Sequence, residues 1–402
     1  MSDVATGAQN RTLRLILTLL LTLSSGALGD TKSADDWQIT QPDAVSLSEE
    51  ALSSISQDIE NGRYGHIDAF LVARHGKLVF EQYYKHDYPS IYGQEAATPG
   101  ALVVNDPSGP YNYFNPWWHP YYRNTTLHSM QSVTKSVVSA LVGIAISRGE
   151  FPTLDTPVLQ FFDEATVLNI DRRKRDMTVR DLLTMSEGLL WDENLPYNDP
   201  ENSFAVMAKA HNWVQYTLDL PMGTEPSTVF NYNSGATLIL GHIFRLATGI
   251  DIEEYAVEHL FTPLGINDYF WDRTPYGLTD TQEGLYISAR SLAKIAQLFL
   301  QKGRWQDEQV IPATWIGEST APHYLTGAAG DEAYGYLWWS QPYTFQERTL
   351  RGYFGKGFGG QRPIFLPELD MVIVLTGWNI LPGQPFFHAM EAIERVTAAI
   401  TE

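Results

Sequence analysis

Ser132 and Lys135 are the residues whose types and spacing best suit covalent chemistry. They open a nearly all-apolar stretch, residues 132–148, which we expect to form a buried helix ended by Gly149. A spacing of three places two side chains on one helix face, so the Lys135 amine can take the proton of the Ser132 hydroxyl. Burial disfavours a charged amine, and a helix N-terminus favours negative charge on the serine oxygen. The pair therefore predicts an acyl-enzyme formed on Ser132.

The same spacing occurs once more, at Ser291 and Lys294. This second pair lies inside an amphipathic stretch, residues 288–301, and not at the start of a helix. We interpret it as a coincidence of packing.

Two further elements could complete a site around Ser132. Tyr232 lies in a polar turn, residues 230–235, directly before a predicted helix, where its phenol could act as a second general acid or base. Residues 355–361 contain four glycines and run into a predicted strand. Glycines let the backbone approach a ligand closely, so a main-chain N–H here and that of Ser132 could form an oxyanion hole.

The elements that must position these residues follow from periodicity. Hairpin strands are predicted on either side of residues 74–77, strands also near the C-terminus, and mostly helices between them. This order predicts an α/β (α+β) fold: an antiparallel sheet domain from residues 30–149 and 285–402, with an inserted helical lobe at 150–284. The predicted helices cover 47–61, 132–148, 179–185, 203–218, 236–247, 252–260, 288–301, 312–319 and 387–400, and the predicted strands 69–73, 78–83, 335–339, 361–366 and 371–376.

Together these elements resemble the family of class C serine β-lactamases, D-alanyl-D-alanine peptidases and related esterases. The resemblance covers about residues 47–400 and includes family-like stretches at 178–189, 284–293 and 334–339. It implies a β-lactamase-like fold, with Ser132 as nucleophile, Lys135 as its base partner and Tyr232 as second acid or base. It also implies an oxyanion hole formed by the N–H groups of Ser132 and Gln361.

Two departures from the family pattern concern substrate binding. The family's Tyr-x-Asn triplet ends in Ser234, which replaces a side-chain amide by a hydroxyl. The family's Lys-Thr-Gly strand reads Phe358-Gly359-Gly360, which removes a cation that would pair with a substrate carboxylate. Lys356 stands two residues earlier. We therefore expect an enzyme for uncharged acyl groups, most simply a carboxylesterase.

Other functions stay open. An amidase or peptidase similar to 6-aminohexanoate-dimer hydrolase or to D-amino peptidases, or a weak β-lactamase, would use the same chemistry, whereas a catalytically silent binding module would use none. An aromatic run at 111–122 contains Trp118, which could wall an acyl pocket. His119 and His128 could be alternative bases, but Lys135 already serves Ser132, and the chain has no Gly-x-Ser-x-Gly elbow.

Composition limits the remaining classes. A net charge of -20 argues against nucleic-acid binding, and the absence of cysteine excludes thiol catalysis and thiolate metal sites. No metal or nucleotide motif is present, so we expect no cofactor and a small-molecule ester or amide as the only ligand. Basic residues, a short apolar run and small residues within 1–29 predict a signal peptide. We expect a periplasmic or secreted protein that is not inserted in a membrane after cleavage.

Overall fold

The computed structural model of the chain describes residues 37–97, 119–326 and 331–401. These residues belong to one compact unit that begins at Trp37. The predicted signal peptide lies outside them. The division into a sheet domain and a helical lobe stays a prediction.

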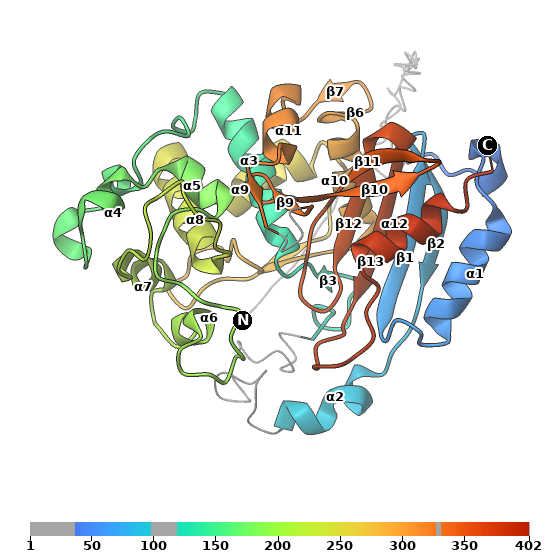
Figure 1. Cartoon of the computed structure of the whole chain (residues 1–402), viewed down its shortest axis with the longest axis horizontal. Coiled ribbons are helices and arrows are strands. Elements are labelled where there is room, and N and C mark those ends of the chain that lie inside the picture. Colours follow the sequence, from blue (N-terminus) through green and yellow to red (C-terminus); the bar gives the residue numbers. More distant parts are fainter. Residues whose placement is uncertain (1–36, 98–118, 327–330, 402) are drawn as a thin grey trace, which may run out of the picture. The chain divides into compact units, whose positions relative to one another are not determined.

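An eight-stranded sheet brings the two ends of the described chain together (Figure 1). Its strand order is β2-β1-β13-β12-β11-β10-β9-β8, and every neighbouring pair is antiparallel. The predicted α+β class, an antiparallel sheet with helices, is confirmed. The strands are β1 (Ile67–Arg74), β2 (Lys77–Tyr83), β8 (Tyr324–Leu325), β9 (Ala333–Tyr334), β10 (Trp339–Phe345), β11 (Arg348–Phe354), β12 (Arg362–Leu366) and β13 (Met371–Gly377).

Helices cover both faces of this sheet. Successive side chains along β1 point to opposite faces and so contact different helices. Phe70 and Val72 point into a core shared with the helices at the two chain ends, α1 and α12. Ala69 and Leu71 point into a larger core shared with α10 and α3. The sequence of β1 is therefore apolar on nearly every residue, as a strand buried on both faces requires.

The remaining elements are short sheets and helices. Two small sheets contain β3 (His128–Ser129), β4 (Phe270–Trp271) and β5 (Leu285–Ile287), and β6 (Arg304–Trp305) and β7 (Glu308–Gln309). The helices are α1 (Glu49–Glu60), α2 (Tyr88–Ala97), α3 (Val133–Ser147), α4 (Arg172–Asp176), α5 (Val179–Thr184), α6 (Ser203–Met207), α7 (Trp213–Asp219), α8 (Ser234–Thr248), α9 (Ile252–Ala256), α10 (Ala289–Leu300), α11 (Ala313–Thr320) and α12 (Ala389–Thr397), with a π-helical turn at Val257–Phe261.

Two predicted elements were wrong. The helix expected over 203–218 is two helices, α6 and α7, because Asn212 caps a new helix by accepting a hydrogen bond from the Gln215 N–H. The strand expected over 335–339 is mostly a turn in which Leu337 has a φ of 62°. β10 and β11, which follow this turn, form a hairpin that the sequence analysis missed, since Pro342 and alternating polar residues weaken its strand pattern.

No single helix of the described residues is long and apolar enough to cross a membrane. α8 and the helical segment Ile252–Phe261 pass that test only as a pair, and the pair is bent by 78°.

Candidate active site

Ser132 stands at the N-terminus of α3, a helix that is buried over most of its length. Residues 133–145 of this helix are all buried, whereas Ser132 is only half-buried. The preceding residue, Gln131, has a φ of 49°, which turns the chain sharply into the helix. Ser132 is therefore the point at which the helix N-terminus can be reached from outside.

Lys135 is 1% exposed, and its ammonium group contacts two oxygens. Its Nζ donates to the Ser132 Oγ at 3.0 Å and to the main-chain carbonyl of Gln282 at 2.9 Å. The three-residue spacing thus brings the two side chains together on one helix face, and the Gln282 carbonyl fixes the lysine from behind.

Tyr232 completes this cluster from a segment a hundred residues away. The Lys135 Nζ lies 5.2 Å from the centre of its ring. Burial raises the pKa of the Tyr232 phenol, while the charge of Lys135 and hydrogen bonding to Ser132 and Lys135 lower it. The ring stacks on Trp339 at 6.0 Å between centroids and meets the Tyr334 ring edge-on. The hydroxyl, amine and phenol predicted to act together do lie in one place.

The glycine-rich segment 355–361 runs directly beside the turn that carries Ser132. A Cβ added to Gly357 would lie 2.6 Å from the Met130 carbonyl oxygen, and one added to Gly355 would lie 3.1 Å from the Val133 Cγ2. Such distances leave no room for a side chain, so glycine permits the close approach.

Gln361, at the end of this segment, is fully buried. Its side-chain amide binds the main chain of Gly377 on β13 and the Phe358 carbonyl. The Gln361 side chain thus stabilises the loop formed by residues 355–361. Any contact of Gln361 with an oxyanion would come from its main chain, as predicted for the oxyanion hole, and that role stays a prediction.

The predicted substrate-binding residues differ in burial and in their contacts. The Ser234 hydroxyl is buried and donates to Glu193 at 3.0 Å, so it is already engaged. Phe358 is half-buried, and its ring meets the Tyr197 ring at 6.0 Å. Gly359 and Gly360 have φ values of 83° and 125°, which favour glycine. Trp118 lies outside the described residues.

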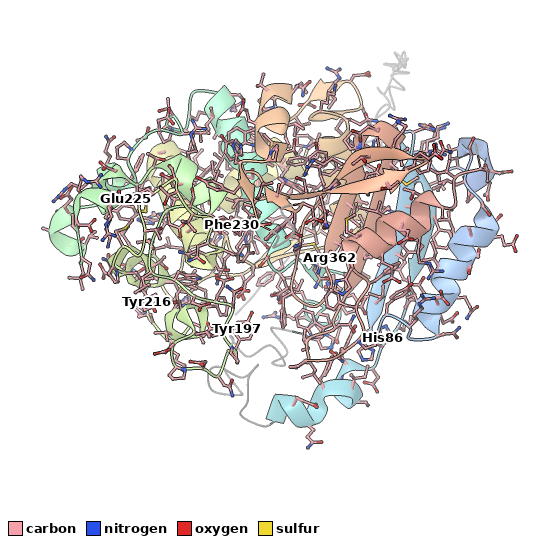
Figure 2. The ribbon with its side chains drawn as sticks, in the orientation of Figure 1. His86, Tyr197, Tyr216, Glu225, Phe230 and Arg362 are labelled. Carbon is pink, nitrogen blue, oxygen red and sulfur yellow. The ribbon has the colours of Figure 1, made fainter. Side chains whose placement is uncertain are left out.

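Aromatic rings from both the helices and the sheet line this region. Figure 2 shows Tyr197 and Phe230 on loops that connect the helices, and Arg362 on the sheet. Phe230 packs against Tyr334 at 5.0 Å, beside the Tyr232 ring. The Arg362 guanidinium donates to the main-chain carbonyls of Gly357 and Gln361 and so supports the glycine-rich segment.

Lys356 is paired with an acid and does not extend freely into the site. Its Nζ forms an ion pair with Glu332 and lies 3.9 Å from the centre of the Trp339 ring. Burial lowers the pKa of this lysine, and Glu332 opposes that effect. The positive charge is thus balanced within the protein.

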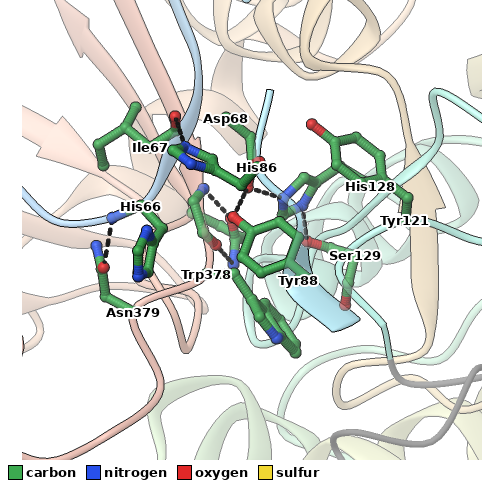
Figure 3. Close-up of polar contacts among 12 residues, drawn as sticks. His66, Ile67, Asp68, His86, Tyr88, Tyr121, His128, Ser129, Trp378 and Asn379 are labelled. Carbon is green, nitrogen blue, oxygen red and sulfur yellow. Dashed lines mark hydrogen bonds and ion pairs between the residues drawn. The ribbon is translucent and has the colours of Figure 1, made fainter. Parts of the chain in front are cut away.

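His128 belongs to a second polar network, which includes Asp68, Tyr88 and Ser129 (Figure 3). Its Nδ1 contacts the Ser129 carbonyl at 2.9 Å, and its Nε2 contacts Asp68 Oδ2 at 3.0 Å. Tyr88 donates to the same carboxyl oxygen at 2.8 Å. Both ring nitrogens are occupied, so this geometry ties β3 to β1 and gives Ser132 no second base. His119 contacts the Tyr88 ring edge-on.

Two residues beside the cluster were missed by the sequence analysis. Glu193 binds the start of α8, and the Gln282 carbonyl accepts from Lys135. Neither stands in a recognisable spacing from Ser132 or Tyr232, so only the folded chain reveals them. Among the residues the structure describes, no group of three His, Cys, Asp or Glu side chains could hold a metal ion.

Comparison with known proteins identifies the family of the chain and the fold that it shares with solved structures. The family model described as Beta-lactamase matches residues 63–390. A curated relative, monacolin J acid methylbutanoyltransferase of Aspergillus terreus, is 32% identical over 114 residues, which are 28% of this chain and 27% of the relative. The chain thus spans about a quarter of that relative's length.

Two solved structures share the fold over most of their length. A putative 6-aminohexanoate-dimer hydrolase from Bacillus anthracis superposes with a TM-score of 0.63 at 18% identity, covering 90% of this chain and 85% of that one. A family VIII carboxylesterase superposes with a TM-score of 0.61 at 15% identity, covering 87% of this chain and 96% of that one.

Proposed function

Because the chain belongs to the beta-lactamase family, whose members are serine hydrolases acting on esters or amides, we propose that Ser132 is its nucleophile. Lys135 and Tyr232 are its proton-transfer partners. The observation that carries this assignment is the 3.0 Å contact between Lys135 Nζ and Ser132 Oγ at the N-terminus of a buried helix.

The reaction has two halves. The Ser132 Oγ attacks the substrate carbonyl carbon, and its proton passes to Lys135 or Tyr232. The resulting oxyanion is stabilised by the main-chain N–H groups of Ser132 and Gln361. The bond to the leaving alcohol or amine then breaks, and the proton passes to that group. Water attacks the acyl-serine, the acid departs, and the Ser132 oxygen regains a proton through the same partners.

The preferred substrate is an ester with an uncharged acyl group. Both cations that border residues 358–360 are engaged within the protein: Lys356 forms an ion pair with Glu332, and Arg362 donates to the main-chain carbonyls of Gly357 and Gln361. Rings of Phe358 and Tyr197 lie at the same loop and offer an apolar surface. A substrate carboxylate would therefore find little compensation for the water it loses. Amides and β-lactams are the weaker substrates in this proposal.

The test uses a p-nitrophenyl short-chain ester and the Ser132→Ala variant. We expect the variant to remain folded and to lose turnover, and a fluorophosphonate probe to label Ser132 of the wild-type chain. Retained turnover would refute the nucleophile. A folded wild-type chain with no label and no turnover of ester, amide or β-lactam would indicate a silent binding module.

A second candidate is acyl transfer to an alcohol, favoured by the methylbutanoyltransferase relative. In that reaction an alcohol replaces water in the second half. Adding alcohols to the ester assay and measuring the new ester against the free acid separates the two functions, since a hydrolase yields mainly acid.

We also propose export through residues 1–29. N-terminal sequencing of protein secreted from an expressing cell tests it, and an N-terminus that retains these residues would refute cleavage.

A further inference from the structure

Two glutamates from the loop after α5 hold the turn that carries Tyr232. The Asn233 Nδ2 donates to Glu187 Oε1 at 2.7 Å. The Ser234 N–H and hydroxyl donate to Glu193 at 2.8 and 3.0 Å. Each of the two residues that follow Tyr232 is therefore fixed by one glutamate.

The two glutamates differ in their hydrogen-bond donors. Glu193 accepts three hydrogen bonds, since the Trp191 Nε1 also donates to it at 2.8 Å. An ionised carboxylate only accepts, so three donors favour the charged form, and the N-terminus of α8 favours it further. Glu187 has one oxygen without a partner, and burial raises its pKa to about 8. Glu193 is thus the better candidate for the charged one of the two.

Lys135 faces other buried acids from the loop before β5. Burial raises the pKa of Asp280 to about 7 and also raises that of Glu283, so both carboxyl groups hold a proton to higher pH than free carboxyl groups do. Burial raises the pKa of Glu193 too, but Lys135 and the donors of Ser234 and Trp191 oppose this effect. The titratable groups around Glu193 and Lys135, from every element packed there, are Glu187, Tyr232, Asp272, Asp280, Glu283 and Tyr334.

We propose that Glu193 is a positioning residue that fixes Ser234 at the start of α8, two residues after Tyr232, and thereby controls the pH dependence of Ser132 activation. The inference rests on the proposed function. The negative charge of Glu193 raises the pKa of Tyr232 and so opposes formation of its phenolate. The base form needed to activate Ser132 therefore appears at higher pH when Glu193 is charged than when it is absent.

The experiment compares pH profiles of kcat/KM for the wild type, Glu193→Gln and Glu193→Asp. Glu193→Gln keeps the shape and removes the charge, so we expect the acid limb to move to lower pH by about one unit or more. Glu193→Asp keeps the charge and should keep the wild-type limb despite lower activity. If Glu193→Gln loses activity but retains the wild-type limb, the role is only structural and the proposal is overturned.

Glu150→Gln is the matched control. Glu150 follows the C-terminal end of α3, opposite to Ser132, and pairs with Arg148. This variant should keep the wild-type profile, and a shifted limb in it would overturn the proposal by showing that the shift is not specific to Glu193.

A second readout separates this inference from the proposed function. Labelling of Ser132 by a fluorophosphonate probe is followed against pH. No labelling of the wild type at any pH means that the proposed function fails, whereas labelling with the same pH dependence in Glu193→Gln means that only this inference fails. If Glu193→Gln does not fold, Ser234→Ala decides, because it removes one of the three donors that favour the charged form of Glu193: an acid limb moved to lower pH supports the proposal, and a wild-type limb overturns it.

Discussion

Replacing Glu187 by glutamine should stabilise the protein increasingly as the pH rises. Glu187 is 1% exposed, and burial raises its pKa from 4.5 to about 8. One of its oxygens accepts from Asn233, and the other has no partner among the described residues. Glutamine reproduces the neutral acid in shape and keeps the acceptor for Asn233, but it cannot ionise.

The size of the effect follows from proton linkage. The pKa of Glu187 is about 4.5 in the unfolded chain and about 8 in the folded protein. At a pH between these two values, Glu187 holds a proton in the folded protein that it has lost in the unfolded chain. Stability from this group is therefore fully present below the unfolded pKa and is lost as pH rises toward the folded one, at about 1.4 kcal/mol per unit. From pH 5 to pH 7 the free energy of unfolding of Glu187→Gln should rise by about 3 kcal/mol relative to the wild type.

Urea unfolding at pH 5, 6, 7 and 8 measures this difference. Burial also raises the pKa of Asp280, but this residue is present in both proteins, so its contribution to the pH dependence of stability cancels in the comparison. Glu150→Gln serves again as control, because the Arg148 and Tyr255 hydrogen bonds lower the pKa of Glu150, so its effect should be constant above pH 5. A stability difference for Glu187→Gln that does not change with pH would refute the reasoning.

Two further substitutions test the site. Tyr232→Phe keeps the ring against Trp339 and removes only the hydroxyl. We expect kcat for the ester to fall by about 10²–10⁴-fold, with little change in the thermal unfolding midpoint. An unchanged kcat would show that Tyr232 takes no part in the chemistry. Gly357→Ala places a Cβ 2.6 Å from the Met130 carbonyl oxygen and should destabilise the fold by about 1–3 kcal/mol and reduce turnover. Gly317→Ala, in α11 with no atom within 4 Å of the new Cβ, should be neutral or stabilising, and equal effects of the two alanines would contradict the close-approach argument.

Much of the fold was predictable because its signals are local. The apolar run of β1, the turn at His75 and Gly76, and the uniform apolarity of α3 each depend on neighbouring residues. The hairpin of β10 and β11 was not predicted, because its stability comes from the pairing of the two strands within the sheet. The strand propensities of individual residues do not include that contribution.

Part of the candidate site was likewise predictable from local sequence, and part of it was not. The sequence by itself determined that Ser132 and Lys135 share a helix face, because three residues make nearly one helical turn. The same spacing occurs at Ser291 and Lys294, and the sequence separated the two pairs only by their position, since Ser132 stands at the start of its helix and Ser291 lies inside one. In the folded chain the Lys294 Nζ is buried and donates to the Leu264 carbonyl.

Only the tertiary structure decided which charges surround the chemistry. The ion pair of Lys356 with Glu332, the hold of Glu193 on Ser234 and the contact of Lys135 with Gln282 each join residues at least 24 positions apart. Electrostatic effects depend on distance and burial in space. They are therefore fixed by the way these segments pack against α3, and no spacing along the chain records them.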